Sequence, residues 1–137
     1  MRTKHNMKIL YLDIETAPTQ CYTWSLWPKF INPNDVVQAG YTLCWAAMWE
    51  GERNVQFGSI REGEEQMLQT IHALLDRADA VVHYNGTKFD IPTLNREFVR
   101  YGMEPPSSYH QIDLLKTVRK QFRFESNKLD NICMRLG

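Results

Sequence analysis

The first half of the chain is dominated by apolar runs that are too short for helices. Residues 7–12 are mostly apolar and predict a short buried strand, which Pro18 and its polar neighbours end. Residues 36–49 are rich in strand-forming side chains that partly alternate, so they predict a further strand. Residues 50–52 form a turn and residues 54–58 a partner strand, and together these segments predict a β-hairpin.

Two longer segments point to helices. Residues 62–78 repeat their apolar side chains at helical spacing and predict an amphipathic helix. A compact apolar strand over residues 80–84 follows. Residues 91–101 predict a second helix, with Pro92 tolerated in its first turn and Gly102 as its C-terminal stop. The stripe of the first helix consists of Met67, Leu68, Ile71, Leu74 and Leu75.

The C-terminal part continues the alternation of strands and helices. After a linker over residues 104–108 we expect a short strand over 109–112, then helices over 113–121 and 127–136. Strands alternating with helices in this order predict an α/β fold, a mixed sheet with helices packed against it.

Residues 20–35 contain aromatic side chains but no clear period, and Pro28 and Pro33 favour an irregular loop or the edge of a strand. The two tryptophans in this segment, Trp24 and Trp27, belong either to the core or to an exposed interaction patch. For Trp45 and Trp49, which lie in a predicted strand, we expect core positions.

Composition limits the class of protein. With 137 residues, 43% hydrophobic and 23% charged, the chain fits one globular domain over residues 1–137. We expect no membrane partner, because no apolar run is long enough for a span, and Asp13 interrupts the first apolar stretch too early for a secretory signal. Three widely spaced cysteines suggest a reducing, cytoplasmic location.

Charge is balanced overall but uneven along the chain. The formal net charge is zero, which excludes a generic polyanion binder with a basic excess. Acids predominate over residues 50–79, whereas bases predominate over residues 113–135. Both runs are consistent with ordinary solvated faces. The alternative for residues 113–135 is a basic flank beside an acidic site. The bases of this segment are Lys116, Arg119, Lys120, Arg123, Lys128 and Arg135.

The first predicted strand ends with two acids, Asp13 and Glu15. Side chains two positions apart on a strand share a face, so these carboxylates repel one another unless a cation lies between them. A divalent metal would supply that charge. The alternative is a strand that finishes in a solvated acidic turn.

A third acid follows the strand over residues 80–84. The segment Asn85-Gly86-Thr87-Lys88-Phe89-Asp90 is a sharp turn that places Asp90 near the start of the next helix, at the carboxyl end of a strand, where α/β sheets usually hold their sites. If the two strands are neighbours, Asp90 converges with Asp13 and Glu15. The alternative is that Asp90 only caps the helix.

The segment LDIET and the later Asn85, Phe89 and Asp90 resemble the first two motifs of the DEDD-type, DnaQ-like 3′–5′ exonucleases, in the ribonuclease H-like superfamily. The resemblance extends over nearly the whole chain and includes the segment QIDLL. It implies a mixed five-stranded sheet whose first three strands are antiparallel, flanked by helices. It also implies hydrolysis of the terminal phosphodiester by two divalent metal ions.

The resemblance assigns expected roles to individual residues. Asp13 corresponds to the carboxylate that bridges both metals, Glu15 to a ligand of the catalytic one and Asp90 to a ligand of the other. Mg²⁺ or Mn²⁺ is the expected cofactor, since hard cations prefer oxygen ligands. Substrate contacts are expected from Thr16 and Ala17, through backbone groups, and from Asn85 and Phe89, which line or brace the cleft; for Phe89, core packing is equally open.

The family's third motif is not found in its usual place. Relatives carry a fourth acid with His-x4-Asp or Tyr-x3-Asp spacing on a last helix, and we expect this chain to be C-terminally truncated before it. Tyr109 and Asp113 have the second spacing, which makes Asp113 a candidate additional acid, but they follow Asp90 too closely. We expect the histidines to be surface or strand positions.

Two functions follow from these expectations. The first is a metal-dependent 3′–5′ exonuclease that acts on the 3′ end of single-stranded DNA or RNA, crippled if the third motif is absent and then holding at most one metal. The second is a non-catalytic remnant that binds nucleic acid or a protein partner.

Overall fold

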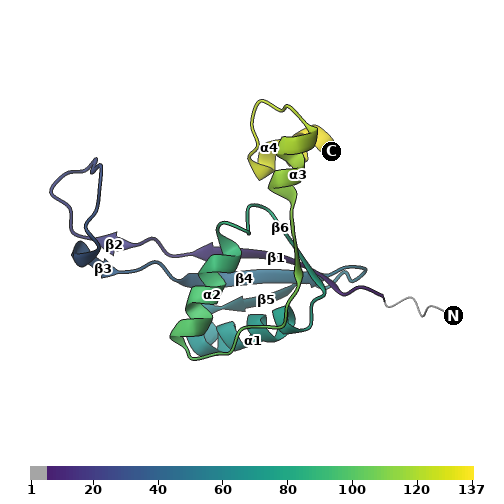
Figure 1. The fold of residues 1–137 in the computed structure, drawn as a ribbon, viewed down its shortest axis with the longest axis horizontal. Helices are drawn as coiled ribbons and strands as arrows, with labels where there is room; N and C mark the ends of the chain where they lie inside the picture. The colour runs from purple at the N-terminus through teal and green to yellow at the C-terminus, as the bar shows by residue number, and fades with distance from the viewer. Residues whose placement is uncertain (1–5) are drawn as a thin grey trace.

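A computed structural model of the chain describes residues 6–137, and its main body is a five-stranded sheet (Figure 1). The strand order is β5-β4-β1-β6-β7. β1 pairs antiparallel with β4 and β4 with β5, while β6 and β7 run parallel to β1. The predicted mixed sheet with three antiparallel strands is therefore confirmed. Its strands are β1 (Ile9–Thr16), β4 (Thr42–Trp49), β5 (Gln56–Ser59), β6 (Ala80–His83) and β7 (His110–Asp113).

The core lies on one face of this sheet, under the helices α1 (Glu64–Asp76) and α2 (Asp90–Arg100). Leu10, Leu12 and Ile14 of β1 point into it, while the residues between them are exposed. The alternation arises because successive side chains of a strand point to opposite faces. The predicted helical stripe is buried in full, in contact with this face.

Trp45 is the largest side chain of the core. It is 1% exposed, and its indole Nε1 donates a hydrogen bond to the Met67 carbonyl at 3.0 Å. Trp49 is partly buried and packs against the same cluster. The expected core positions of these two tryptophans are confirmed.

Two projections leave the body (Figure 1). Residues 18–40 form the first, here called the β2–β3 arm, with strands β2 (Gln20–Cys21) and β3 (Val36–Gln38) and a 3-10 turn over Pro33–Asp35. The second, here called the α3–α4 unit, consists of α3 (Leu114–Gln121) and α4 (Leu129–Leu136). A further 3-10 turn, Ile60–Glu62, leads into α1.

The strand predicted over residues 36–49 is two strands in different sheets, which corrects the sequence interpretation. β3 pairs with β2 in the arm, whereas β4 joins the main sheet. The chain changes partner around Gly40, where an added Cβ would lie 2.7 Å from the Ala17 carbonyl oxygen. Only a glycine allows this close approach of the two backbones.

Among the helices within residues 6–137, none combines the length and the apolar character needed to cross a membrane.

Candidate functional site

Asp13 and Glu15 lie on the face of β1 that the helices leave open. Both side chains are exposed and alternate with the buried Leu12 and Ile14. A register irregularity between Glu15 and Thr16 ends the regular pairing with β4. The predicted placement of the two carboxylates on one face is therefore confirmed.

Asp90 is the first residue of α2 and is only 4% exposed. Its Oδ2 atom is buried and has no hydrogen-bond partner among the described residues. Burial, together with the nearby Asp13 carboxylate, raises the pKa of Asp90 from 3.8 to about 6, although the backbone N–H groups of Ile14 and of Asp90 itself oppose the rise. A buried, unpaired carboxylate beside another acid is the environment that a bound cation would stabilise.

The alternative that Asp90 caps its helix is wrong. The N-cap position of α2 is Phe89, and no side chain there accepts a capping hydrogen bond. Phe89 is 46% exposed, so the interpretation of Phe89 as a core residue is also wrong. Its ring is at the surface, immediately next to the buried Asp90.

Asp113 ends β7, opposite His83 of β6. Its Oδ1 accepts hydrogen bonds from the backbone N–H groups of Asn85, at 2.8 Å, and Leu115, at 3.1 Å, and it caps α3. Although burial raises the pKa of Asp113, these N–H donors outweigh it and hold the pKa below its ordinary value. Asp113 also lies close enough to raise the pKa of Asp90.

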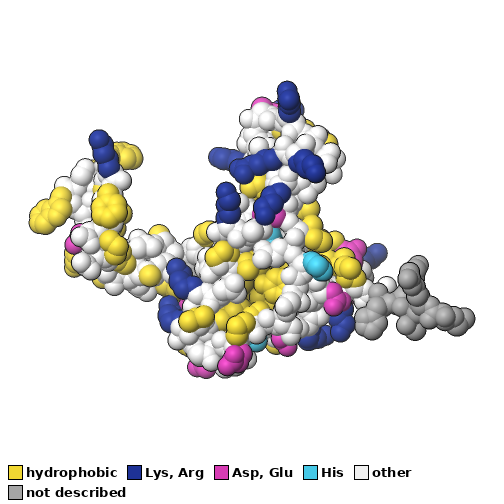
Figure 2. Space-filling view, viewed as in Figure 1, with side chains coloured by type: hydrophobic (Ala, Val, Ile, Leu, Met, Phe, Trp, Pro, Cys, Tyr) yellow, Lys and Arg dark blue, Asp and Glu magenta, His cyan; other side chains and the backbone are white. Residues whose placement is uncertain are grey.

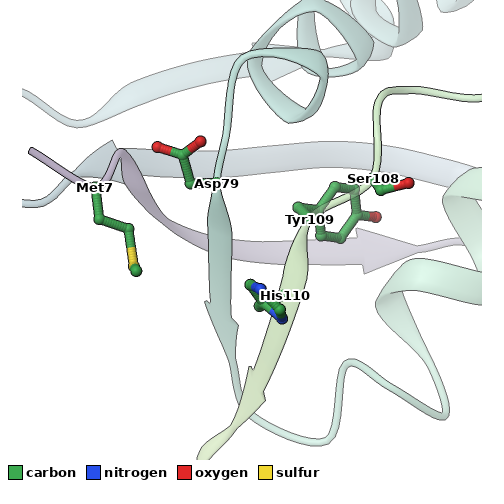
Figure 3. A pocket seen from close by; sticks show the side chains of 5 residues that line it. All are labelled: Met7, Asp79, Ser108, Tyr109 and His110. Carbon is green, nitrogen blue, oxygen red and sulfur yellow. The ribbon is translucent and has the colours of Figure 1, made fainter. Parts of the chain in front are cut away.

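Tyr109 does not act together with Asp113 as the Tyr-x3-Asp spacing suggested. It precedes β7, packs partly buried against the core, and lies a full strand length from Asp113, roughly 13 Å. It lines a hollow of about 380 Å³ at the amino ends of β6 and β7, together with Asp79 and His110 (Figure 3). The carboxylates are at the other end of these strands, so this hollow is no part of their site.

The turn between β6 and α2 is built around Asn85. Its φ of 62° is left-handed, a conformation that asparagine tolerates better than most residues. The Asn85 carbonyl accepts hydrogen bonds from the N–H groups of Lys88 and Phe89, both at 3.2 Å. Asn85 thus joins the carboxylate of Asp113 to the start of α2.

The residues expected to contact substrate through their backbone lie where β1 meets the arm. Thr16 is half-buried and pairs with Thr42. The N–H group of Ala17 already donates to the Tyr41 carbonyl at 2.8 Å. Any backbone contact with a ligand would have to use the other main-chain groups of this pair.

His83 is not placed as a free catalytic base. His83 is buried, and burial lowers its pKa. Its Nδ1 accepts the Gly86 N–H at 3.0 Å, which leaves Nε2 to donate to Gln111 at 3.2 Å. An added Cβ at Gly86 would overlap the imidazole, so the His83–Gly86 pair shapes the turn. His5 lies outside the described residues.

The metal sites implied by the resemblance were tested against this geometry. Within residues 6–137, no three His, Cys, Asp or Glu side chains lie close enough together to hold a metal ion. Asp13 and the unpaired Oδ2 of Asp90 do fit a shared hard cation, with Glu15 on the same face of β1. The predicted convergence of Asp13, Glu15 and Asp90 on one metal is therefore not found among the described residues: Asp13 lies near Asp90, and Glu15 shares only the face of β1 with Asp13.

Sequence reasoning missed a groove of about 310 Å³ on the open face of the sheet. Asp13 lies in its wall, with Met48 and Val82 of the sheet and with Leu114 and Leu129 of the α3–α4 unit. Alternating apolar residues on β1 and β4 were the available signal, but the sequence could not show which face the helices would leave open.

A comparison with protein families matches residues 38–137 to the RNase_H superfamily, and this match covers more than half of the chain. The chain belongs to this superfamily. Proteins of the RNase H superfamily are usually nucleases that use divalent metals. The matched residues include Asp90 and Asp113 but not β1 with Asp13 and Glu15. A search of curated proteins found no match.

Among solved structures, the RNase H-like chain is similar to the family B DNA polymerase from the hyperthermophilic archaeon Pyrobaculum calidifontis. The TM-score is 0.66 and the sequence identity 16%, over 96% of this chain and 18% of the polymerase. This likeness shows a shared fold, and the chain spans less than a fifth of the length of the polymerase.

Proposed function

We propose that this chain is a DEDD-type 3′–5′ exonuclease, which hydrolyses phosphodiesters at the 3′ end of single-stranded DNA or RNA with the help of Mg²⁺ or Mn²⁺. The observation that carries the proposal is the buried Oδ2 of Asp90, which has no hydrogen-bond partner among the described residues and lies beside the Asp13 carboxylate. A protein gains nothing in stability from such a pair, so its presence on a nuclease fold supports a catalytic role.

Each acid has a distinct part in the proposed site. Asp13 and Asp90 would hold the cation between β1 and the start of α2. Glu15, which is exposed on β1, would add a further negative charge near the cation. Bound divalent metals would supply a hydroxide at neutral pH and charge to stabilise the leaving oxygen. Asp113 keeps the turn that carries Asn85 in place and is the candidate additional acid.

Around the acids, Thr16, Ala17, Asn85 and Phe89 are the proposed substrate contacts. The ring of Phe89, which is 46% exposed, would stack on a terminal base. The apolar groove beside Asp13 offers a second surface for the same nucleotide.

The test is digestion of single-stranded DNA and RNA oligonucleotides labelled at either end, with Mg²⁺ or Mn²⁺. Asp13→Asn and Asp90→Asn should each abolish release of the 3′ nucleotide, because each removes charge from the cation pair. Glu52→Gln, which neutralises an exposed acid in the turn before β5, is the matched control and should digest as the wild type does. Equal digestion by all four proteins would refute the proposal, and release from the 5′ end would refute its direction.

One observation favours the alternative of a non-catalytic binder. No group of three acids is gathered in residues 6–137, while the α3–α4 unit is exposed and basic. That alternative predicts salt-sensitive binding of single strands without turnover at any metal concentration. Sustained nucleotide release by the purified chain would exclude it.

A further inference from the structure

The tip of the β2–β3 arm exposes large aromatic side chains that the proposed site does not use. Trp24, Trp27 and Phe30, here called the aromatic tip, are 105%, 90% and 78% exposed. Figure 2 shows hydrophobic side chains gathered at the end of this projection, well away from the sheet. Apolar side chains at such exposure usually mark a surface that binds something.

The arm is attached firmly to the strand that carries the carboxylates. Its first residues follow directly after β1, and the chain returns beside them: the Ala17 N–H donates to Tyr41, and the Gly40 N–H donates to the Thr19 hydroxyl at 3.1 Å. Arg96 of α2 donates to the Gly40 carbonyl at 2.5 Å. These bonds fix the base of the arm to both β1 and α2, the two elements that supply Asp13 and Asp90.

The arm is structured beyond its base. The Tyr22 N–H donates to the Asp35 carbonyl at 2.9 Å, and the Asn32 side chain caps the 3-10 turn over Pro33–Asp35. The aromatic tip therefore projects from a ribbon whose two sides are joined by hydrogen bonds.

The loop that carries the aromatic tip, residues 22–34, contains no acid. The arm has one base, Lys29, which lies within the tip, and one acid, Asp35, which lies in the 3-10 turn before β3. The second projection exposes six bases within residues 113–135, whereas the acid-rich residues 50–79 belong to the body (Figure 2). A strand with anionic phosphates would therefore meet no acidic side chain of the tip loop itself.

We infer that the aromatic tip is a stacking platform for the bases of a single-stranded nucleic acid whose end lies at the carboxylates of β1 and α2. The inference rests on the proposed function for the position of that end. Aromatic rings stack on any base, because every base has a π-face, and Lys29 adds a positive charge beside them. The tip would hold the strand several nucleotides from the reacting bond.

Leu26 distinguishes base stacking from a general apolar contact. It is as exposed as Trp27, at 90%, and lies next to it in the same loop, but it has no ring. A docking surface for a protein would use Leu26 and Trp27 alike, since both bury apolar area. A stacking platform for bases depends on the rings of Trp24 and Trp27 and not on Leu26.

The experiment measures binding of a fluorescein-labelled oligothymidylate of about 16 nucleotides by anisotropy, in EDTA and with Asp13→Asn as the background, so that no hydrolysis interferes. We expect Trp24→Ala and Trp27→Ala each to weaken binding at least about five-fold, Trp27→Phe to restore most of it, and Leu26→Ala to change it less than about two-fold. An oligonucleotide of the same length with abasic sites should bind all variants equally.

Several outcomes would overturn the inference. Equal loss from Leu26→Ala and Trp27→Ala would indicate a general apolar contact, and unchanged binding by all tip variants would exclude stacking. A dimer in sedimentation that Trp27→Ala dissociates, with oligonucleotide binding intact, would assign the tip to self-association. Because the binding assay needs no turnover, tip-dependent binding combined with a wild-type chain that releases no nucleotide in the digestion assay would refute the proposed nuclease activity alone.

Discussion

Asp90 is the residue whose environment departs most clearly from that of an exposed acid. Its carboxylate is buried beside Asp13, and its pKa is raised from 3.8 to about 6. Between these two pH values the unfolded chain releases the proton while the folded chain keeps it. The free energy of unfolding therefore falls as pH rises through this window, by at most about 3 kcal/mol.

Asp90→Asn should remove this pH dependence. His83 acts in the opposite sense, because its lowered pKa means that stability is lost as pH falls below its ordinary value of 6.5. We therefore compare the free energy of unfolding of wild type with that of Asp90→Asn, measured by urea unfolding in EDTA at about pH 4.5 and at about pH 7. We expect the variant to gain stability relative to wild type at the higher pH. A constant difference would contradict the raised pKa.

Variants of Asp113 test whether this residue stabilises the turn at Asn85 or acts as the additional acid. Asp113→Ala removes the acceptor of the Asn85 and Leu115 N–H groups and should cost about 1–2 kcal/mol in urea unfolding. Asp113→Asn keeps an acceptor oxygen and should cost much less. If Asp113→Asn folds well but loses nuclease activity, Asp113 is the additional acid; if it keeps activity, Asp113 is a cap that holds the turn.

Packing between elements is close where Gly58 of β5 lies opposite Trp45 of β4. An added Cβ at Gly58 would lie 2.5 Å from the indole, whose Nε1 is bonded to α1. Since the ring is fully buried and cannot move away, Gly58→Ala should destabilise by about 1–3 kcal/mol. Trp45→Phe should relieve part of this cost in the double variant, and a double-mutant cycle of thermal unfolding measures the coupling. Strict additivity would show that the two side chains do not meet.

The elements of the body could be predicted from sequence because their patterns are local. Ile9–Thr16, Glu64–Asp76 and Asp90–Arg100 carry the alternation or the stripe that burial of one face requires. The split between β3 and β4 could not be predicted, because both segments favour strand structure and the sequence does not show with which strand each one pairs. The same applies to β2, whose two residues give no periodic signal.

The positions of the candidate acids at the ends of strands could be predicted from the sequence. Asp13 and Glu15 had to share a face, and Asp90 had to follow β6. The burial of Asp90 and the use of Asp113 as an acceptor for two N–H groups depend on how β7 and the Asn85 turn pack. Those are tertiary contacts, which no spacing in the sequence encodes.

At the scale of the molecule, a net charge of zero conceals an uneven distribution. The α3–α4 unit exposes most of the bases of residues 113–135, and among them only Arg135 is paired with an acid, Glu125, among the described residues. We expect the affinity for single strands to fall with salt, with a slope that measures the number of phosphates neutralised.

Replacing Lys116 and Arg119 by Gln should lower that slope by about one for each phosphate that is no longer neutralised, and should weaken binding equally for all base sequences. Both side chains are exposed, so folding should be unaffected. Arg53→Gln, in the turn before β5, serves as the control and should leave the slope unchanged. If the slope is identical in all three proteins, the phosphates bind at another surface of the molecule.

The base of the β2–β3 arm has a consequence for how such proteins diversify. The chain leaves β1 and returns to β4 at adjacent points, joined by the bond from Ala17 to Tyr41. An insertion or deletion between these points leaves the register of the main sheet unchanged, so arm length and tip sequence can drift independently of the acids. The main sheet should therefore fold independently of the arm. A chain with residues 18–40 replaced by a short glycine turn should retain the same folded body.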